Sequence, residues 1–326
     1  MLPCHRIDVH HHMATEYQPV FDIARGADMT WWSLEAAIRM MDENDIRMAI
    51  LSSVPKLPKS KAVLNTMTRI RDGWLGRTKP LREAMRRGAR KTNEEAAAMA
   101  RLRPDRFGFF ATINLLNAQD AIAEASYALD SLGAAGIFMP TNIGKVYLGD
   151  PVFEPLFAEL NRRREVVFVH PLHLPCPLVP GIPGHAIDFL HSTVRAATNL
   201  VQKGVMQRHA DIKFILCHGG GYIPYAVQRF SRILAATYPE RSAREYLQDY
   251  RKFYFDTALA TAPATLSALL ALAQPDHVLY GSDFPFSQPD EVSFFARQLD
   301  GLDLDAELRF AINSANALAL LPRLGM

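Results

Sequence analysis

Short apolar runs alternate with amphipathic stretches along nearly the whole chain. The runs are rich in valine, isoleucine and phenylalanine and contain few polar residues, which is typical of strands buried on both faces. We expect strands at residues 6–12, 47–54, 107–113, 135–140, 166–171, 213–218, 253–259 and 278–285.

The stretches between these runs carry apolar residues at helical spacing. The first, residues 33–44, begins with Ser33, a residue type that caps helices. Further helices are expected at residues 118–132, 151–163, 187–209, 222–237, 262–272 and 305–320. The alternation predicts an α/β fold, a distorted (β/α)8 TIM barrel formed as a single domain over residues 1–326. A doubly wound open sheet is the alternative, but no glycine-rich dinucleotide loop follows the first strand.

One connection is longer than a barrel requires. Residues 55–106 separate the second and third strands, and we expect a helical insertion between these strands. Its middle, residues 77–91, is strongly basic, and its end, residues 92–102, resembles a helix opened by a capping box at Asn93. We favour a solvated helical surface over a lid or subunit contact, because charge runs usually face water.

Composition excludes several classes of function. The 326 residues are 49% hydrophobic, enough to bury a full-sized core. The net charge of +2 gives no electrostatic basis for binding nucleic acid or membranes. No apolar stretch reaches the roughly 18 residues of a transmembrane helix. The three cysteines show no CxxC pairing, which favours a reduced, cytoplasmic compartment.

Polar residues that bind metals stand at the ends of the expected strands. His10 and His12 end the first strand, His170 the fifth, His218 the sixth and Asp283 the eighth. In a barrel, the C-terminal ends of all strands meet at one mouth, where active sites are built. The sequence therefore predicts a metal site at this mouth.

Strand geometry divides the three consecutive histidines of the first strand. Residues two apart point the same way, so His10 and His12 can bind one metal while His11 points away. Imidazole and carboxylate donors suit one divalent ion, for which we favour Zn²⁺, with Mn²⁺ as the alternative.

Other residues are candidates for contacting the substrate. The glycines after His218 allow the backbone to approach a ligand closely. Arg229 is placed to meet a carboxylate, although a surface arginine fits its spacing equally well. Phe284, Phe286 and Tyr222 are expected to bring aromatic side chains to the mouth, where they could contact a ligand.

The motif set HxH, VFVHP, CHGGGYIPYAVQR, YFDTALA and LYGSDFPF resembles the amidohydrolase superfamily. More narrowly it resembles the branch of 2-amino-3-carboxymuconate 6-semialdehyde decarboxylase and the salicylate-type (6-methylsalicylate, hydroxybenzoate) decarboxylases. The resemblance extends from Ile7 to about Leu321. The strand-rich segment that carries a second substrate arginine in the muconate-semialdehyde enzymes is shortened here, which favours a smaller, hydroxybenzoate-like acid.

The resemblance also implies roles for individual residues. The metal ligands would be His10, His12, His170 and Asp283, and His218 would be the catalytic acid/base or a further ligand. Arg229 would reach the substrate carboxylate of a neighbouring subunit, which implies a homodimer.

Together these features favour a metal-dependent, non-oxidative decarboxylase of an aromatic or unsaturated carboxylic acid, with a small-molecule acid as its binding partner. The metal would act as a Lewis acid, and His218 or Asp283 would move the proton that replaces carbon dioxide. A metal-dependent hydrolase of an amide, lactone or C–C bond is the alternative. The fourth strand carries Phe138, Met139 and Pro140 and no lysine to bridge two metals, which argues against a binuclear hydrolase. A non-enzymatic binding protein fits a full ligand set poorly.

Overall fold

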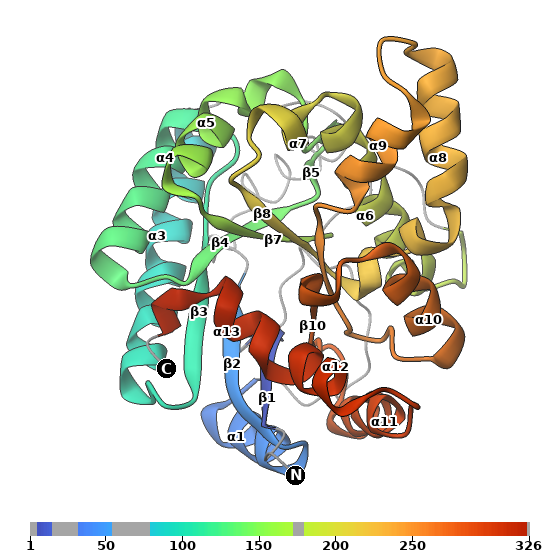
Figure 1. The fold of residues 1–326 in the computed structure, drawn as a ribbon. Helices are drawn as coiled ribbons and strands as arrows, with labels where there is room; N and C mark the ends of the chain where they lie inside the picture. Colours follow the sequence, from blue (N-terminus) through green and yellow to red (C-terminus); the bar gives the residue numbers. More distant parts are fainter. Residues whose placement is uncertain (1–4, 15–31, 54–78, 172–178, 325–326) are drawn as a thin grey trace.

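Eight parallel strands form a nearly closed barrel in the computed structural model, which describes residues 5–14, 32–53, 79–171 and 179–324 (Figure 1). Each of these strands lies within or next to a stretch where the apolar runs predict one, so the expected barrel is confirmed. In barrel order the strands are β1 (Arg6–His12), β2 (Ile46–Ser52), β3 (Phe107–Thr112), β4 (Gly136–Pro140), β7 (Val166–His170), β8 (Lys213–Leu216), β9 (Tyr254–Asp256) and β10 (Val278–Leu279). Two further strands, β5 (Asn142–Ile143) and β6 (Val146–Tyr147), form a small antiparallel hairpin after β4.

Backbone hydrogen bonds close the seam between the first and last strands. The N–H of Val9 donates to the carbonyl of Tyr280 at 3.0 Å. Beyond the end of β10, the N–H of Asp283 donates to the carbonyl of His10 at 2.8 Å. The seam therefore brings residues near both ends of the chain into contact at the barrel mouth.

Helices surround the strands (Figure 1). They are α1 (Leu34–Glu43), α3 (Lys79–Leu102), α4 (Ala118–Tyr127), α5 (Glu154–Arg163), α6 (Gly184–Gln202), α7 (Val205–Arg208), α8 (Ile223–Thr237), α9 (Ala243–Tyr250), α10 (Pro263–Leu272), α11 (Pro289–Asp300), α12 (Ala306–Phe310) and α13 (Asn316–Leu320). The expected cap is present, because the Ser33 hydroxyl accepts the N–H of Ala36 at 3.1 Å. α9 and α11 are not foreseen by the helical spacing. No described helix is both long enough and apolar enough to cross a bilayer.

The connection between β2 and β3 is only partly covered, because residues 54–78 lie outside the described residues. Its remainder forms α3, which packs on β3 and α4 as the connecting helix of a barrel does (Figure 1). A helical insertion here therefore stays a prediction. The expected helix start at Asn93 is wrong, because α3 runs through it. The Asn93 amide is instead buried, where it donates to the Thr112 carbonyl at 2.9 Å and accepts the Thr112 N–H at 2.8 Å.

The basic run at residues 77–91 is neutralised along α3. The ion pairs found in its described part are Arg82–Asp120, Arg86–Glu83, Arg87–Glu83, Arg90–Glu124 and Lys91–Glu95. The arginine and lysine side chains of these pairs are each 40% or more exposed, as expected of a solvated helical surface.

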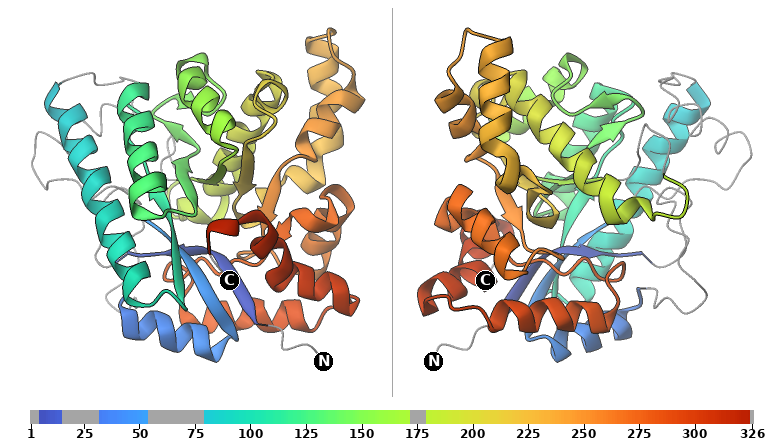
Figure 2. Two further views of the ribbon diagram at one scale, coloured as in Figure 1. Left: turned by 60° about the vertical axis from the view of Figure 1, so that its left-hand side comes forward. Right: turned by 90° about the vertical axis from the view of Figure 1, so that its right-hand side faces the viewer.

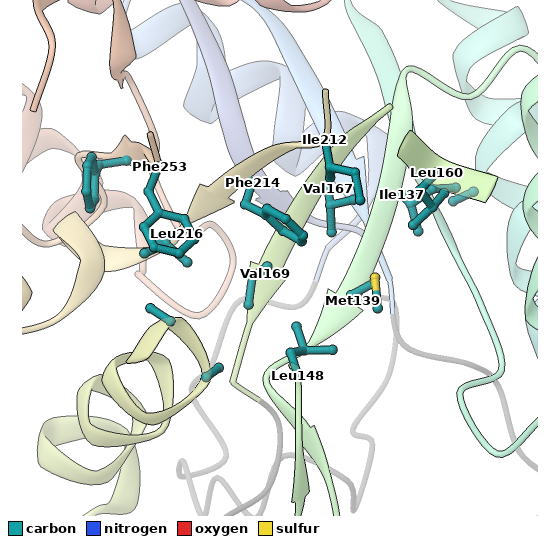
Figure 3. Packing of buried hydrophobic residues seen from close by; sticks show 14 of the residues in the cluster. Ile137, Met139, Leu148, Leu160, Val167, Val169, Ile212, Phe214, Leu216 and Phe253 are labelled. Atoms are coloured by element: carbon teal, nitrogen blue, oxygen red, sulfur yellow. The ribbon is translucent and has the colours of Figure 1, made fainter. Parts of the chain in front are cut away.

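Alternate residues of each strand face opposite sides of the barrel wall. One set packs outward against the helices: Ile137, Met139, Val167, Val169, Phe214 and Leu216 belong to this layer (Figure 3). The other set fills the barrel interior and includes Phe110, Phe138, Phe168, Ile215 and Cys217. The rings of Phe110 and Phe168 stack with their centroids 5.5 Å apart, so an aromatic floor underlies the mouth.

Candidate metal centre

Strand β1 presents His10 and His12 to the same side, as the spacing of the two residues predicts. Both side chains are buried, and their Nε2 atoms lie 3.0 Å apart. Two imidazole nitrogens at this distance leave room for one shared proton or for a cation between them. The short distance between the two Nε2 atoms therefore favours a proton or a cation bound between them.

His11 faces the opposite side. Trp32 donates its indole N–H to His11 Nε2 at 3.0 Å, so the His11 ring carries its proton on Nδ1, which lies 3.2 Å from Asp8 Oδ2. The Asp8 carboxylate also accepts the backbone N–H and the hydroxyl of Ser282, at 3.0 and 2.6 Å. Asp8 and His11 therefore fasten β1 to the segment that carries Asp283.

The second ring nitrogen of His10 and that of His12 are each held by a buried partner. Nδ1 of His10 lies 2.8 Å from Asp256 Oδ2, and Nδ1 of His12 lies 2.8 Å from the Ser52 hydroxyl. Such partners fix the orientation of a ligating imidazole and raise its basicity. With both Nδ1 atoms engaged, both Nε2 atoms are directed into the cluster.

His170 and Asp283 complete a group of four donors. The His170 ring centroid lies 5.0 Å from that of His10 and 4.7 Å from that of His12. Asp283 Oδ1 lies 3.2 Å from His10 Nε2 and 3.1 Å from His12 Nε2. One ligand atom from each of the four residues lies within 4.8 Å of every other.

Unpartnered polar atoms test whether these residues fit a metal. Among the described residues, neither ring nitrogen of the buried His170 has a hydrogen-bond partner. Buried polar atoms rarely stay unsatisfied in folded proteins. Three imidazoles and one carboxylate are a usual donor set for Zn²⁺ or Mn²⁺, so the residues fit a divalent cation.

The electrostatics of the cluster agree with this fit. Burial alone would lower the pKa of His10, but the charges of Asp256 and Asp283 outweigh it and raise that pKa to about 10. Burial lowers the pKa of His12 to about 4. Burial and the neighbouring histidines lower the pKa of His170 well below its usual range. Burial would raise the pKa of Asp283, yet His10 and hydrogen bonds from the histidines lower it well below its usual range. The two carboxylates therefore create a strongly cation-attracting site.

His218 stands beside this group. Its Nε2 lies 3.3 Å from Asp283 Oδ2, and its backbone N–H donates to Asp256 Oδ1 at 2.9 Å. The side chain is 10% exposed, so it can meet both the cluster and a ligand in the mouth. Asp256, which the sequence reasoning missed, thus orients His10 and anchors the backbone of His218 together.

The backbone around His218 is left-handed. His218 has φ 55°, and Gly219, Gly220 and Gly221 have φ of 62°, 72° and 66°. A Cβ on Gly221 would lie 2.7 Å from the carbonyl oxygen of Leu190 in α6. Glycine is therefore required here both for the backbone conformation and for the close approach of α6.

The residues that the sequence suggests for substrate binding lie mostly away from the four donors. Phe284 is fully buried with its ring 5.2 Å from that of His11, on the side of β1 away from the four donors. The Tyr222 hydroxyl hydrogen-bonds His191 Nδ1 at 2.7 Å. Arg229 is exposed on α8. The structure therefore brings His10, His12, His170, His218 and Asp283 together, and it leaves Phe284, Tyr222 and Arg229 outside that group.

Two other rings stand closer to the donors. The Phe286 ring lies 5.0 Å from that of His12, and the Phe189 ring of α6 lies 6.3 Å from that of His170. The four donors are thus flanked by aromatic surface.

The chain matches known proteins over nearly its whole length. The family model described as Amidohydrolase covers residues 7–323. The chain is 34% identical to 6-methylsalicylic acid decarboxylase of Penicillium expansum, over 98% of this chain and 97% of that protein.

Solved structures share the fold. A 2,6-dihydroxybenzoate decarboxylase in complex with 2,6-dihydroxybenzoate superposes with a TM-score of 0.78 at 21% identity, over 98% of this chain and 99% of that one. A dihydroxybenzoic acid decarboxylase from Polaromonas sp. JS666, with bound manganese and the inhibitor 2-nitroresorcinol, gives a TM-score of 0.77 at 21% identity, over 98% and 97% of the two chains.

Proposed function

The chain belongs to the amidohydrolase family, and from this membership we propose that it is a metal-dependent decarboxylase of a hydroxybenzoate-type acid. The observation that carries the proposal is the group of four donors with His218 beside it. The relationship to 6-methylsalicylic acid decarboxylase, at 34% identity over almost the whole chain, supports carboxylate removal over hydrolysis.

His10, His12, His170 and Asp283 would hold one divalent cation. Bound there, the cation supplies a Lewis acid for the oxygen atoms of a carboxylate and of a hydroxyl next to it. The protein's part is to keep these ligands oriented, through Asp256 for His10 and Ser52 for His12.

His218 supplies the proton in this proposal. The Asp283 carboxylate is ionised, because its pKa lies well below the usual range, so His218 Nε2–H is the donor of the hydrogen bond between them. That proton is transferred to the ring carbon that bears the carboxylate, the bond between this carbon and the carboxylate breaks, and carbon dioxide leaves. The ring regains its aromaticity with a hydrogen in place of the carboxylate.

Aromatic side chains near the donors would orient the ring. We assign this role to Phe286 and Phe189, whose rings lie beside His12 and His170. We do not assign this role to Phe284, because its side chain is wholly buried against His11.

The three imidazoles of the donor set favour zinc, and its carboxylate also allows manganese. The donor types in the sequence favour zinc, whereas the structurally similar Polaromonas decarboxylase carries manganese. We therefore extend the proposal to both ions, and metal analysis of the purified protein together with add-back of each ion identifies the native one.

His218→Gln tests the proposed reaction. The purified wild type, supplied with Mn²⁺ or Zn²⁺, should release carbon dioxide from at least one acid of a panel of salicylates and dihydroxybenzoates. His218→Gln should bind the metal normally and lose most of the activity, roughly 10²-fold or more, since general acids contribute about that much. Turnover of esters or lactones by the wild type, with no carbon dioxide from any acid, would contradict the proposal.

We further propose a homodimer built on α8. This helix projects from the body of the protein (Figure 2) and exposes the apolar side chains of Tyr225, at 90%, and Ile233, at 51%, beside Arg229. Arg229 would reach the substrate carboxylate bound in the partner subunit. Light scattering should give twice the chain mass, and Arg229→Ala should raise KM more than it lowers kcat. A monomeric active enzyme would exclude this arrangement.

A further inference from the structure

Cys217 lies between the end of β8 and His218, and the proposed reaction does not use its thiol. The side chain is wholly buried in the interior cluster that also contains Phe168, and its Sγ lies 3.7 Å from the Thr193 hydroxyl. Burial, together with the charge of Asp256, raises the pKa of the thiol well above its usual range.

Two histidines place nitrogen atoms next to this sulfur. One donor atom each from His170, Cys217 and His218 lies within 4.8 Å of the others. The His170 side chain is only 2% exposed, and in the described part of the chain both of its ring nitrogens are unpartnered, as is Nδ1 of His218.

The four-donor site does not account for all of these nitrogens. A single ion there takes one nitrogen of His170. The other nitrogens of His10 and His12 are satisfied by Asp256 and Ser52, whereas within the described residues the remaining nitrogen of His170 has no such partner. One nitrogen of His170, one nitrogen of His218 and the sulfur of Cys217 form a second group of donors, of softer character than the first, and the two groups share His170.

We propose that His170, Cys217 and His218 form a second cation site, which takes a soft divalent ion such as Cd²⁺ or excess Zn²⁺ and thereby inhibits the enzyme. Thiolate with imidazole selects such ions, whereas Mn²⁺ prefers oxygen donors. On binding, the ion forms a bond to sulfur and the thiol proton passes to the solvent. Inhibition follows because an ion bound to His218 Nδ1 keeps that nitrogen from holding a proton, so that transfer of the Nε2 proton would leave an unfavourable imidazolate. This part rests on the proposed function; the binding itself does not.

Ultraviolet absorption tests the binding. Cadmium bound to a thiolate gives a charge-transfer band, and the chain has three cysteines, of which Cys4 and Cys176 lie outside the described residues. The full-length, manganese-loaded protein titrated with CdCl₂ should show a band that saturates at one equivalent per chain. The double variant Cys4→Ser/Cys176→Ser should keep this band, and Cys217→Ser should lose it. A band that survives in Cys217→Ser, or that is missing from the double variant, overturns the site.

Inhibition is tested with Cys217→Ala. Its rate without Cd²⁺ should equal that of the wild type, while the Cd²⁺ concentration for half inhibition should rise roughly tenfold or more, as expected when one ligand is lost. Equal sensitivity of the two proteins would contradict the inhibitory role. Because the absorption band requires no turnover, a protein without decarboxylase activity would still report on the site.

Discussion

At the scale of single residues, hydrogen bonds orient two of the proposed metal ligands, His10 and His12, through the ring nitrogen that faces away from the cluster. Asp256 holds His10, and Ser52 holds His12, each at 2.8 Å. Since an imidazole held at Nδ1 presents Nε2 in one direction, these partners set the shape of the site before any ion binds.

Asp256→Asn tests this role. Asparagine keeps the size of the side chain and an acceptor for the backbone N–H of His218, but it removes the charge that faces His10. We expect the affinity for Mn²⁺ or Zn²⁺ to fall about 10–100-fold, measured by competition with a chelating dye. Asp276→Asn is the matched control, because that side chain is 74% exposed and lies 3.9 Å from its nearest basic partner, His277. Unchanged affinity in Asp256→Asn would remove Asp256 from the account.

Metal binding should also release a proton. The two carboxylates raise the pKa of His10 to about 10, so in the metal-free protein His10 is protonated at neutral pH and must lose that proton to become a ligand. Below pH 10 the affinity should therefore fall about tenfold per pH unit as the pH decreases. Calorimetric titrations at pH 7.5 in buffers of different ionisation enthalpy should yield about one proton released per ion. Binding without proton release would show that His10 is not a ligand.

Some residues of the site can be predicted from the sequence and others cannot. Strand alternation predicts that His10 and His12 share a face, and their Nε2 atoms indeed lie 3.0 Å apart. Asp256 was missed because a short strand does not reveal which histidine its final residue meets across the barrel. The position of Phe284 against His11 could not be read from strand alternation, because β10 ends at Leu279 and Asp283 has φ 63°.

At the scale of elements, the left-handed turn at residues 218–221 determines where His218 lies. The turn is trapped between β9 and α6, since a Cβ on Gly220 would meet the Phe255 ring at 2.8 Å and one on Gly221 the Leu190 carbonyl at 2.7 Å. The positive φ angles and the close contacts with β9 and α6 therefore both restrict residues 218–221, and with them the position of His218.

Paired glycine substitutions separate these two effects. Gly133 also has a left-handed φ, 79°, but nothing lies within 4 Å of a Cβ added there. Gly133→Ala should therefore lower the free energy of unfolding by only about 1–2 kcal/mol, the cost of the backbone conformation. Gly221→Ala should cost more, because its ψ of −128° lies outside the left-handed helical region of Gly133 and because backbone atoms of α6 must also move, and it should reduce activity. Denaturant unfolding of both variants measures the difference, and equal costs would show that the contact with α6 is unimportant.

The order of strands and most helices follows from the hydrophobic pattern alone, because buried parallel strands are continuously apolar and the covering helices are amphipathic. The exceptions are local. α9 has eight residues and the strands β5 and β6 have two each, too few for a period to be recognised. α11 begins at Pro289, which suits the first turn of a helix, directly after the loop of Asp283 that was interpreted as strand.

At the scale of the whole molecule, the four proposed ligands join distant parts of the chain. His10 and His12 come from the first strand, His170 from β7 and Asp283 from the segment after β10. An ion that binds all four stabilises only the closed barrel, since the unfolded chain cannot assemble the site.

Removal of the metal should therefore lower thermal stability. At a free ion concentration about 100 times Kd, binding adds about 2.7 kcal/mol to the free energy of unfolding. Calorimetry of the protein before and after dialysis against a chelator should show this loss and its recovery on add-back of Mn²⁺. His12→Ala should show no shift with Mn²⁺; if it responds as the wild type does, the ion binds elsewhere.

The most direct test of the central claim is carbon dioxide release from 6-methylsalicylate and 2,6-dihydroxybenzoate by chelator-treated protein, before and after one equivalent of Mn²⁺ or Zn²⁺ per chain. The account predicts no release from the metal-free protein and restored release from at least one acid with at least one of these ions. Release that is independent of metal, or none under any condition while metal binds, would contradict it.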